Sequence, residues 1–429
     1  MSHTPLANRH VGIIGAGLIG LCSAHYLQRA GATVTVYDRS HFGSGAARGN
    51  GGLIATTNAV PLPGPGVVRD ALAHLFSAKS AFFVKPSAVP KLSPFLARFA
   101  LRSSAAHHNS ALAKLDLLTA HTTDLFRELS SEGIGTSMSE DGMLRCFTSM
   151  DNARAERAAF VRLLERGFAP DAGPLLDREQ IRSVEPTVGP AVTAGYVLPG
   201  ERWANPSSFV DELADSLKNR GVRLVENTPI DTIGEDVRGP YVVIDEAVVR
   251  FDDIVIAAGA RSGALSAQFG VNIRQQPGKG YSFCVTPERL PSKVLMLSDT
   301  HCAIIPLDDG RVRIAGTMEF DGTYEHMNVK RLEQLRIAAR ANFSGIDWST
   351  VEDEWVGARP MTTDGIPLIG PLTDTNRVVL ATGHNMLGFA LAPATASLVT
   401  DVISGRSADR ANELKAFHPR RFQTRKVSA

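Results

Sequence analysis

The 429-residue sequence is poor in cysteine, with only four residues of this type. Cys22, Cys146, Cys284 and Cys302 are scattered, without the close spacing of metal ligands or of a C-x-x-C redox pair. This pattern argues against a metal site and against a disulfide framework. We expect four reduced thiols in the core of a cytoplasmic protein.

An excess of charge of one sign is also lacking, because 45 lysines and arginines balance 44 aspartates and glutamates, for a net charge of +1. No field strong enough to gather nucleic acid follows, so nucleic acid is excluded as a partner. Long apolar runs are missing too: no stretch of about 18 apolar residues could span a bilayer, and the first ten residues lack a signal-peptide core.

Glycine, by contrast, is abundant, and its first group lies in VGIIGAGLIGLCSAHYLQRAGATVTVYDRS, residues 11–40. An apolar strand runs into Gly15, Gly17 and Gly20 at G-x-G-x-x-G spacing, a helical pattern follows, and a second strand ends at Asp38. Gly15 permits a tight turn, Gly17 permits a diphosphate to approach the backbone, and Gly20 permits close helix packing. The order predicts a dinucleotide site, with Asp38 on an unphosphorylated ribose, and leaves NAD and FAD unseparated.

A second glycine-rich loop, HFGSGAARGNGGLIA, occupies residues 41–55. So many glycines indicate that backbone lies close against another group. A flat ring system is the interpretation we favour over an ordinary flexible loop.

The rest of the chain alternates between two kinds of pattern. Buried strands of nucleotide-fold character recur at 254–258 and 378–381, whereas 274–355 holds short alternating strands typical of an antiparallel sheet. We predict an α/β fold: a discontinuous Rossmann-like domain of residues 1–62, 204–272 and 357–429, with an inserted α+β substrate domain, built on an antiparallel sheet, of residues 63–203 and 273–356.

Residues 76–105 interleave five phenylalanines with prolines and five basic residues. We favour a helical cover over the substrate domain. The alternative is a peripheral contact with anionic lipid on the inner face of the plasma membrane.

Several segments together resemble the FAD-dependent D-amino-acid dehydrogenases, within the glycine oxidase, sarcosine oxidase and D-amino-acid oxidase superfamily. The resemblance is carried, in order, by GIIGAGLIGLCSAHYL, SGAARGNGGLI, DIVIAAGARS, PGKGYS, GARPMTTDGIPLIGP and ATGHNMLGF. It implies non-covalent FAD. A second G-x-G-x-x-G for a nicotinamide is missing from the sequence, so electrons should come directly from the organic substrate.

The resemblance also implies cofactor contacts, residue by residue. The dinucleotide loop should hold the diphosphate, Asp38 and Arg39 the adenosine, residues 50–53 the reactive edge of the ring, Ile230 the adenine, and residues 383–388 the pyrimidine end of the flavin. Asp38 departs from the family's usual glutamate and is shorter. The full predicted set is Gly15, Ala16, Gly17, Leu18, Ile19, Gly20, Asp38, Arg39, Asn50, Gly51, Gly52, Leu53, Ile230, Ala258, Gly259, Gly383, His384, Met386, Leu387 and Gly388.

Three residues are predicted at the substrate. Arg359 stands where the family's carboxylate-binding arginine lies; its alternatives are a surface arginine and a domain-interface salt bridge. Tyr281 should line the substrate pocket, or else pack in the core, and His384 is either a catalytic base or a residue that stabilises its turn. The roles of Arg48 and Lys279 are left open, and His301 is unassigned.

The predicted reaction is oxidation of a small D-amino acid by hydride transfer from Cα to flavin N5, followed by hydrolysis of the imino acid to a 2-oxo acid and ammonia. One alternative is an oxidase or dehydrogenase of glycine, sarcosine, D-proline or hydroxyproline. Another is a flavin-binding subunit without turnover. The sequence leaves the electron acceptor open among a quinone, an electron carrier and O2.

Overall fold

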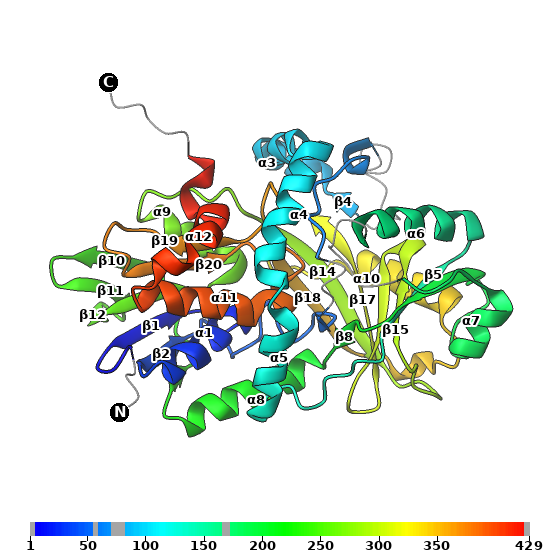
Figure 1. The fold of residues 1–429 in the computed structure, drawn as a ribbon, viewed down its shortest axis with the longest axis horizontal. Helices are drawn as coiled ribbons and strands as arrows, with labels where there is room; N and C mark the ends of the chain where they lie inside the picture. The colour runs from blue at the N-terminus through cyan, green and yellow to red at the C-terminus, as the bar shows by residue number, and fades with distance from the viewer. Residues whose placement is uncertain (1–4, 55–58, 70–81, 165–171, 424–429) are drawn as a thin grey trace.

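The computed structural model describes residues 5–54, 59–69, 82–164 and 172–423. Two large β-sheets lie side by side, each covered by helices (Figure 1). The chain passes between them several times, so both sheets are assembled from separate stretches of sequence.

The first sheet has six strands in the order β19-β20-β13-β1-β2-β9, and all neighbours are parallel except β19 and β20. Its strands are short apolar runs rich in β-branched residues, as expected for strands buried on both faces. They come from three separate parts of the chain, which confirms a discontinuous Rossmann-like α/β fold. Their bounds are β1 His10–Ile14, β2 Thr33–Tyr37, β9 Arg223–Val225, β13 Asp253–Ile256, β19 Leu368–Pro371 and β20 Val378–Thr382.

The second sheet has nine strands, in the order β18-β14-β17-β16-β15-β5-β7-β6, with β4 also paired to β17. Most neighbours are antiparallel, as predicted, but β5 with β15 and β4 with β17 are parallel. The bounds are β4 Phe82–Val84, β5 Met143–Phe147, β6 Leu176–Asp177, β7 Ala194–Leu198, β14 Gln276–Val285, β15 Val294–Leu297, β16 Cys302–Pro306, β17 Val312–Phe320 and β18 Glu352–Met361. Because β18 runs through residue 357, the exact domain division stays a prediction.

Two smaller sheets complete the strands. One pairs β10 Thr232–Asp236, β11 Gly239–Ile244 and β12 Ala247–Arg250, and the other pairs β3 Leu53–Ile54 with β8 Arg202–Trp203. The described α-helices are α1 Leu18–Arg29, α3 Val89–Leu101, α4 Ala105–Thr119, α5 Thr122–Ser131, α6 Met150–Leu164, α7 Arg178–Val184, α8 Pro206–Asn219, α9 Ser262–Ala267, α10 Val329–Asn342, α11 Gly388–Ile403 and α12 Ala411–Phe417.

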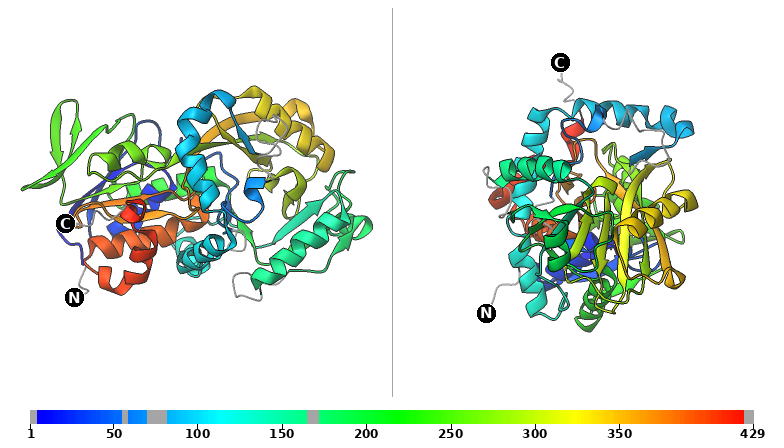
Figure 2. Two further views of the ribbon diagram at one scale, coloured as in Figure 1. Left: turned by 90° about the horizontal axis from the view of Figure 1, so that it is seen from above. Right: turned by 90° about the vertical axis from the view of Figure 1, so that its right-hand side faces the viewer.

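Each sheet is covered on both faces. The six-stranded sheet packs on α1, α8 and α11 on one side, and on α9 and the three-stranded sheet on the other. The nine-stranded sheet packs on α10 on one face and on α6 on the opposite face (Figure 2). The four cysteines are buried in these cores and unpaired, as expected.

The tightest packing of the first sheet lies at the turn from β1 into α1. Gly15 has φ +106°, a conformation that side chains rarely adopt. A Cβ atom on Gly20 would lie 1.8 Å from the carbonyl oxygen of Gly15. The two glycines therefore let the first turn of α1 rest directly on the end of the strand.

The described part of the 76–105 segment is a cover over the nine-stranded sheet; residues 76–81 lie outside the described residues. Phe95 and Phe99 of α3 are buried against Met318 and Phe320 of β17. Lys85, Lys91 and Arg102 point to the exposed surface. Among the helices that the structure describes, none combines the length and the apolar character needed to cross a bilayer.

We predict that Gly20→Ala lowers the free energy of unfolding by about 1–3 kcal/mol, because the added methyl group overlaps a backbone carbonyl that cannot move away without bending β1. The matched control is Gly263→Ala in α9, where the added methyl would meet nothing closer than 3.9 Å. Urea unfolding of both flavin-depleted variants measures the effect. Equal stability of the two would contradict the packing described.

Candidate active site

A cavity of about 1770 Å³ lies between the two sheets and takes lining residues from both. It exceeds the roughly 300–1,000 Å³ of an ordinary ligand pocket, so it has room for a dinucleotide together with a substrate. It brings together nearly all the residues predicted from sequence. The exceptions, which stand behind its wall, are Ala16, Gly20 and Gly383.

Gly17 is one of the glycines whose backbone lines this cavity. It has ordinary extended dihedral angles, φ −79° and ψ −177°, and precedes the first residue of α1. A Cβ atom here would meet no protein atom within 4 Å. Unlike Gly15 and Gly20, it is not required by packing, so the open space in front of it and the N-terminus of α1 form a cradle for an anionic group.

Asp38 lies at the carboxyl end of β2, beside the glycine loop. Its carboxylate accepts hydrogen bonds from the backbone N–H of Ala16 at 2.7 Å and of Ser40 at 2.9 Å. Burial raises its pKa. A carboxylate has about four acceptor positions, so Asp38 closes the turn and retains capacity for the ribose hydroxyls predicted here. Arg39 and Ile230 line the same end of the cavity.

The loop of residues 48–52 is fastened to the nine-stranded sheet by its carbonyl groups. Arg313 donates to the carbonyl of Arg48 at 2.5 Å, and Ser282 donates to that of Gly49 at 2.7 Å. The Asn50 side chain accepts from the N–H of Gly52 at 2.6 Å. The sheet thus sets the position of the backbone predicted to pass the reactive edge of the ring.

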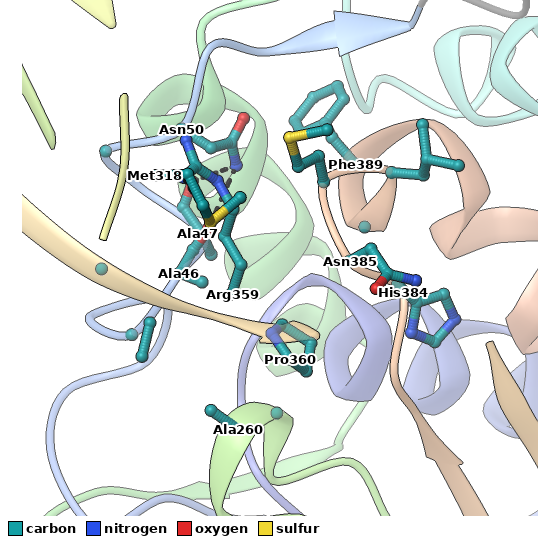
Figure 3. A pocket seen from close by; sticks show the side chains of 18 of the residues that line it. Ala46, Ala47, Asn50, Ala260, Met318, Arg359, Pro360, His384, Asn385 and Phe389 are labelled. Atoms are coloured by element: carbon teal, nitrogen blue, oxygen red, sulfur yellow. Dashed lines mark hydrogen bonds between the residues drawn. The ribbon is translucent and has the colours of Figure 1, made fainter. Parts of the chain in front are cut away.

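On the opposite side, the turn of residues 383–388 leads into α11. Figure 3 shows His384 and Asn385 across the pocket from Asn50. The Asn385 N–H donates to the Pro360 carbonyl at 3.2 Å, and its side-chain oxygen accepts from the Thr362 N–H at 2.9 Å. These bonds tie the turn to the end of β18.

His384 is almost completely buried, and its Nε2 is 2.9 Å from the Thr395 hydroxyl on α11. Burial lowers its pKa to about 3, so the imidazole is neutral. The contact with Thr395 holds the turn against α11, and a catalytic role for His384 stays a prediction.

Arg359 lies at the centre of the site, beside Asn50 and Met318 (Figure 3). Its guanidinium rests on β14 at Gly280, where a Cβ atom would lie 2.2 Å from the guanidinium carbon. Nη1 donates to the carbonyl of Thr317 at 2.9 Å. Among the described residues no carboxylate pairs with Arg359, and burial lowers its pKa to about 10, which leaves it protonated at neutral pH.

Tyr281 and Lys279 belong to the other face of β14, because side chains alternate along a strand. The Tyr281 hydroxyl donates to the Glu319 carboxylate, and Tyr281 is 1% exposed. Lys279 is fully buried and donates to Asp321 at 2.7 Å. The predicted contact of Tyr281 with substrate is untested, while Lys279 serves a buried charge network beneath the sheet.

Arg48, whose role the sequence left open, turns outward. It pairs with Asp211 of α8 at 2.6 Å. Arg48 thereby joins the 48–52 loop to α8, and its side chain is not among the groups that line the cavity.

Sequence reasoning missed the residues that hold the site together. Arg313 and Trp355 carried no signal, since each stands alone in a strand; a Cβ atom on Gly49 would lie 2.0 Å from the Trp355 ring. Asn385 could have been found, because asparagine in a glycine-bounded turn favours the left-handed conformation, and its φ is +53°.

The described residues fit FAD. The cradle at Gly17 suits a diphosphate, Asp38 suits a ribose, and the fastened 48–52 loop and the start of α11 enclose a space between them for the ring. The N-terminus of α11 suits negative charge that develops at the pyrimidine end of a reduced flavin.

We predict that Gly17→Val abolishes FAD binding and leaves the apoprotein fold intact. The valine fits the backbone conformation and meets no protein atom, but it fills the cradle. Flavin absorbance after purification and the thermal midpoint of the flavin-free protein measure the two effects. Gly263→Val is the control, and wild-type flavin content in Gly17→Val would show that the diphosphate lies elsewhere.

Residues 10–402 match the family model described as DAO, FAD dependent oxidoreductase. A D-amino acid dehydrogenase from Agrobacterium fabrum is 29% identical over 409 residues, covering 93% of this chain and 97% of that protein. One from Vibrio vulnificus is 27% identical over 415 residues, covering 94% and 98%.

Solved structures share the fold. The glycine oxidase from Geobacillus kaustophilus aligns with a TM-score of 0.69 at 22% identity, covering 93% of this chain and 95% of that one. Together with the geometry of the cavity and the family match over 10–402, this shows that the chain belongs to the DAO family of FAD-dependent oxidoreductases and uses FAD as its cofactor.

Proposed function

We propose that this protein oxidises a free D-amino acid to the corresponding imino acid, which water hydrolyses to a 2-oxo acid and ammonia. The observation that carries the proposal is the guanidinium of Arg359, a half-buried cation in the cavity with no carboxylate partner among the described residues. A buried charge without a partner is costly, so a site that retains one is suited to a ligand of opposite charge.

The geometry of Arg359 supports a carboxylate as that ligand. Nη1 is occupied by the Thr317 carbonyl and lies 3.8 Å from the Met318 sulfur. The edge formed by Nε and Nη2 has no partner among the residues described. Two parallel N–H groups on one edge match the two oxygens of a carboxylate, which fixes the orientation of the substrate as well as its position.

FAD supplies the chemistry of the step, because it accepts the two electrons and the hydrogen of the substrate Cα–H bond as hydride. The protein orients the substrate through Arg359 and encloses it. As the hydride leaves, the nitrogen lone pair forms the C=N bond of an iminium ion, which gives a proton to water and becomes the neutral imine. A neutral substrate amine and correct orientation are sufficient, which agrees with a His384 that is bonded to Thr395.

The preference for the D-form is supported by the two D-amino acid dehydrogenases, each similar to this chain over more than nine-tenths of its length. An anchor for the carboxylate, one accessible cofactor face and one space for the side chain leave a single way to point the Cα hydrogen at the cofactor. The likeness to glycine oxidase concerns the fold, so we place glycine second.

We predict that Arg359→Lys loses about 2–4 kcal/mol of transition-state stabilisation, because a point charge replaces a planar donor with two parallel N–H groups. Arg359→Ala should lose more. Flavin content should remain normal in both variants, since the side chain contacts substrate in this proposal. The measurement is anaerobic flavin reduction by D- and L-forms of several amino acids.

Arg29→Lys provides the control, because Arg29 pairs with Glu128 on the outer surface of α1. It should reduce at the wild-type rate. Unchanged reduction in Arg359→Ala would remove the carboxylate anchor, and reduction by L-forms alone would overturn the proposed substrate class.

A further inference from the structure

The cavity continues beyond Arg359 along one face of the nine-stranded sheet. Paired residues on neighbouring strands share a face, and the registers align Ser282, Ala315, Ala303, Met296 and Arg145 across five strands. Ser282 contacts the 48–52 loop, so this face is the one turned toward the predicted ring site. The four residues after Ser282 all line the cavity.

The part of this face near Ser282 carries small apolar side chains, and the part near Arg145 carries polar ones. Ala315 and Ala303 leave space above β17 and β16, whereas Arg145 of β5 meets Glu156 of α6. Glu156 Oε1 accepts from Arg145 Nε at 2.8 Å, from the Tyr196 hydroxyl at 3.1 Å and from the Ser298 hydroxyl at 3.3 Å. The other oxygen, Oε2, has no hydrogen-bond partner among the described residues, and the side chain is 35% exposed.

His301 stands beside this pair. It ends the 3-10 turn before β16 with φ +50°, a left-handed conformation that non-glycine residues adopt rarely, and it is one of the residues that line the cavity. Its ring makes no hydrogen bond within the part of the chain described. Residues held in uncommon backbone conformations cluster at ligand sites, and the ring of His301 has hydrogen-bonding nitrogen atoms that a ligand could use.

The charges at this end are unequal. The groups that act on the His301 ring are two carboxylates, Glu156 and Asp299, and one guanidinium, Arg145. Burial lowers the pKa of His301, which favours a neutral ring. Among the described residues that act on His301, carboxylates therefore outnumber guanidinium groups by one, whereas the charged group at the other end of the cavity is the Arg359 cation.

The separation of the two ends sets the length of the ligand. The Thr317 carbonyl that binds Arg359 is on β17, and Arg145 is on β5, three strands away in the sheet order. At the usual strand spacing this is on the order of 14 Å. The side chain of alanine, or the hydrogen of glycine, would leave most of that distance unfilled.

We propose that Glu156, His301 and the paired Arg145 form a subsite for the end of the substrate side chain, and that the preferred substrate is a D-amino acid with a long side chain ending in a cationic nitrogen group. The inference rests on the proposed oxidation of D-amino acids. In it, Arg359 binds the α-carboxylate, Ala315 and Ala303 face the methylene groups, and Glu156 Oε2 accepts from the cationic end.

The test is anaerobic flavin reduction of the holoenzyme by D-arginine, D-lysine, D-norleucine, D-glutamate and D-alanine. We expect D-arginine and D-lysine to exceed D-norleucine, a neutral side chain of similar length, by roughly tenfold or more in efficiency. D-glutamate should be the poorest of the long substrates. Glu156→Gln should lower the ratio of D-arginine to D-norleucine by roughly 30-fold, because the charge is lost and the shape is kept.

A second variant tests the apolar part of the cavity between Arg359 and Glu156 without altering charge. Ala315→Leu narrows the apolar part of the cavity, so the ratio of D-arginine to D-alanine should fall, even if Glu156→Gln proves unstable. Glu128→Gln, which removes a carboxylate paired with Arg29 on the surface, should change neither ratio.

The outcomes separate the two proposals. Good reduction by D-norleucine or D-alanine with no advantage for D-arginine and D-lysine, or an unchanged ratio in Glu156→Gln, would overturn the subsite and leave the proposed function standing. Reduction by none of the D-amino acids would overturn both. A preference for D-glutamate would reverse the sign of the charge argument and also reject the subsite.

Discussion

The contact between the 48–52 loop and the nine-stranded sheet is the interaction on which the site depends. The cavity takes lining residues from both sheets, and the loop, which follows β2, forms part of its wall. Arg313 and Ser282 hold the loop there through its carbonyl groups. With the carbonyls turned toward the sheet, the loop can lie flat at Gly49 beneath the Trp355 ring. The loop that follows the six-stranded sheet is thereby joined to the nine-stranded sheet through its backbone carbonyl groups.

A network of buried charged groups lies on the opposite face of the strands that hold Arg359. Lys279 is bonded to Asp321 and lies 3.3 Å from Glu319, which also accepts from Tyr281. Buried charges are tolerated where they are paired and hydrogen-bonded, and such a network fixes the geometry of the strands that carry it. Its strands, β14 and β17, are those that hold Arg359 through the glycine at 280 and the carbonyl at 317.

Much of the fold was accessible from sequence because its signals are local. Strand, glycine turn and helix follow one another in residues 11–40. The sequence does not show, however, that a Cβ atom would collide with protein atoms at Gly15 and meet open space at Gly17. Other contacts join residues more than 140 positions apart, such as the pairing of β5 with β15 and the approach of Arg145 to His301. No periodicity in the sequence predicts contacts of this kind. Tyr281 shows the same limit: alternation along β14 decides its face, but its partner Glu319 belongs to another strand.

The bond between Asn385 and the end of β18 has a mechanical consequence. The strand that carries Arg359 and the turn that enters α11 are linked by the Pro360 carbonyl and the Thr362 N–H. The end of β18 and the turn of residues 383–388 would therefore move together if one sheet bent against the other. The link therefore fixes the spacing between Arg359 and the turn of residues 383–388 independently of how the rest of the two sheets is packed.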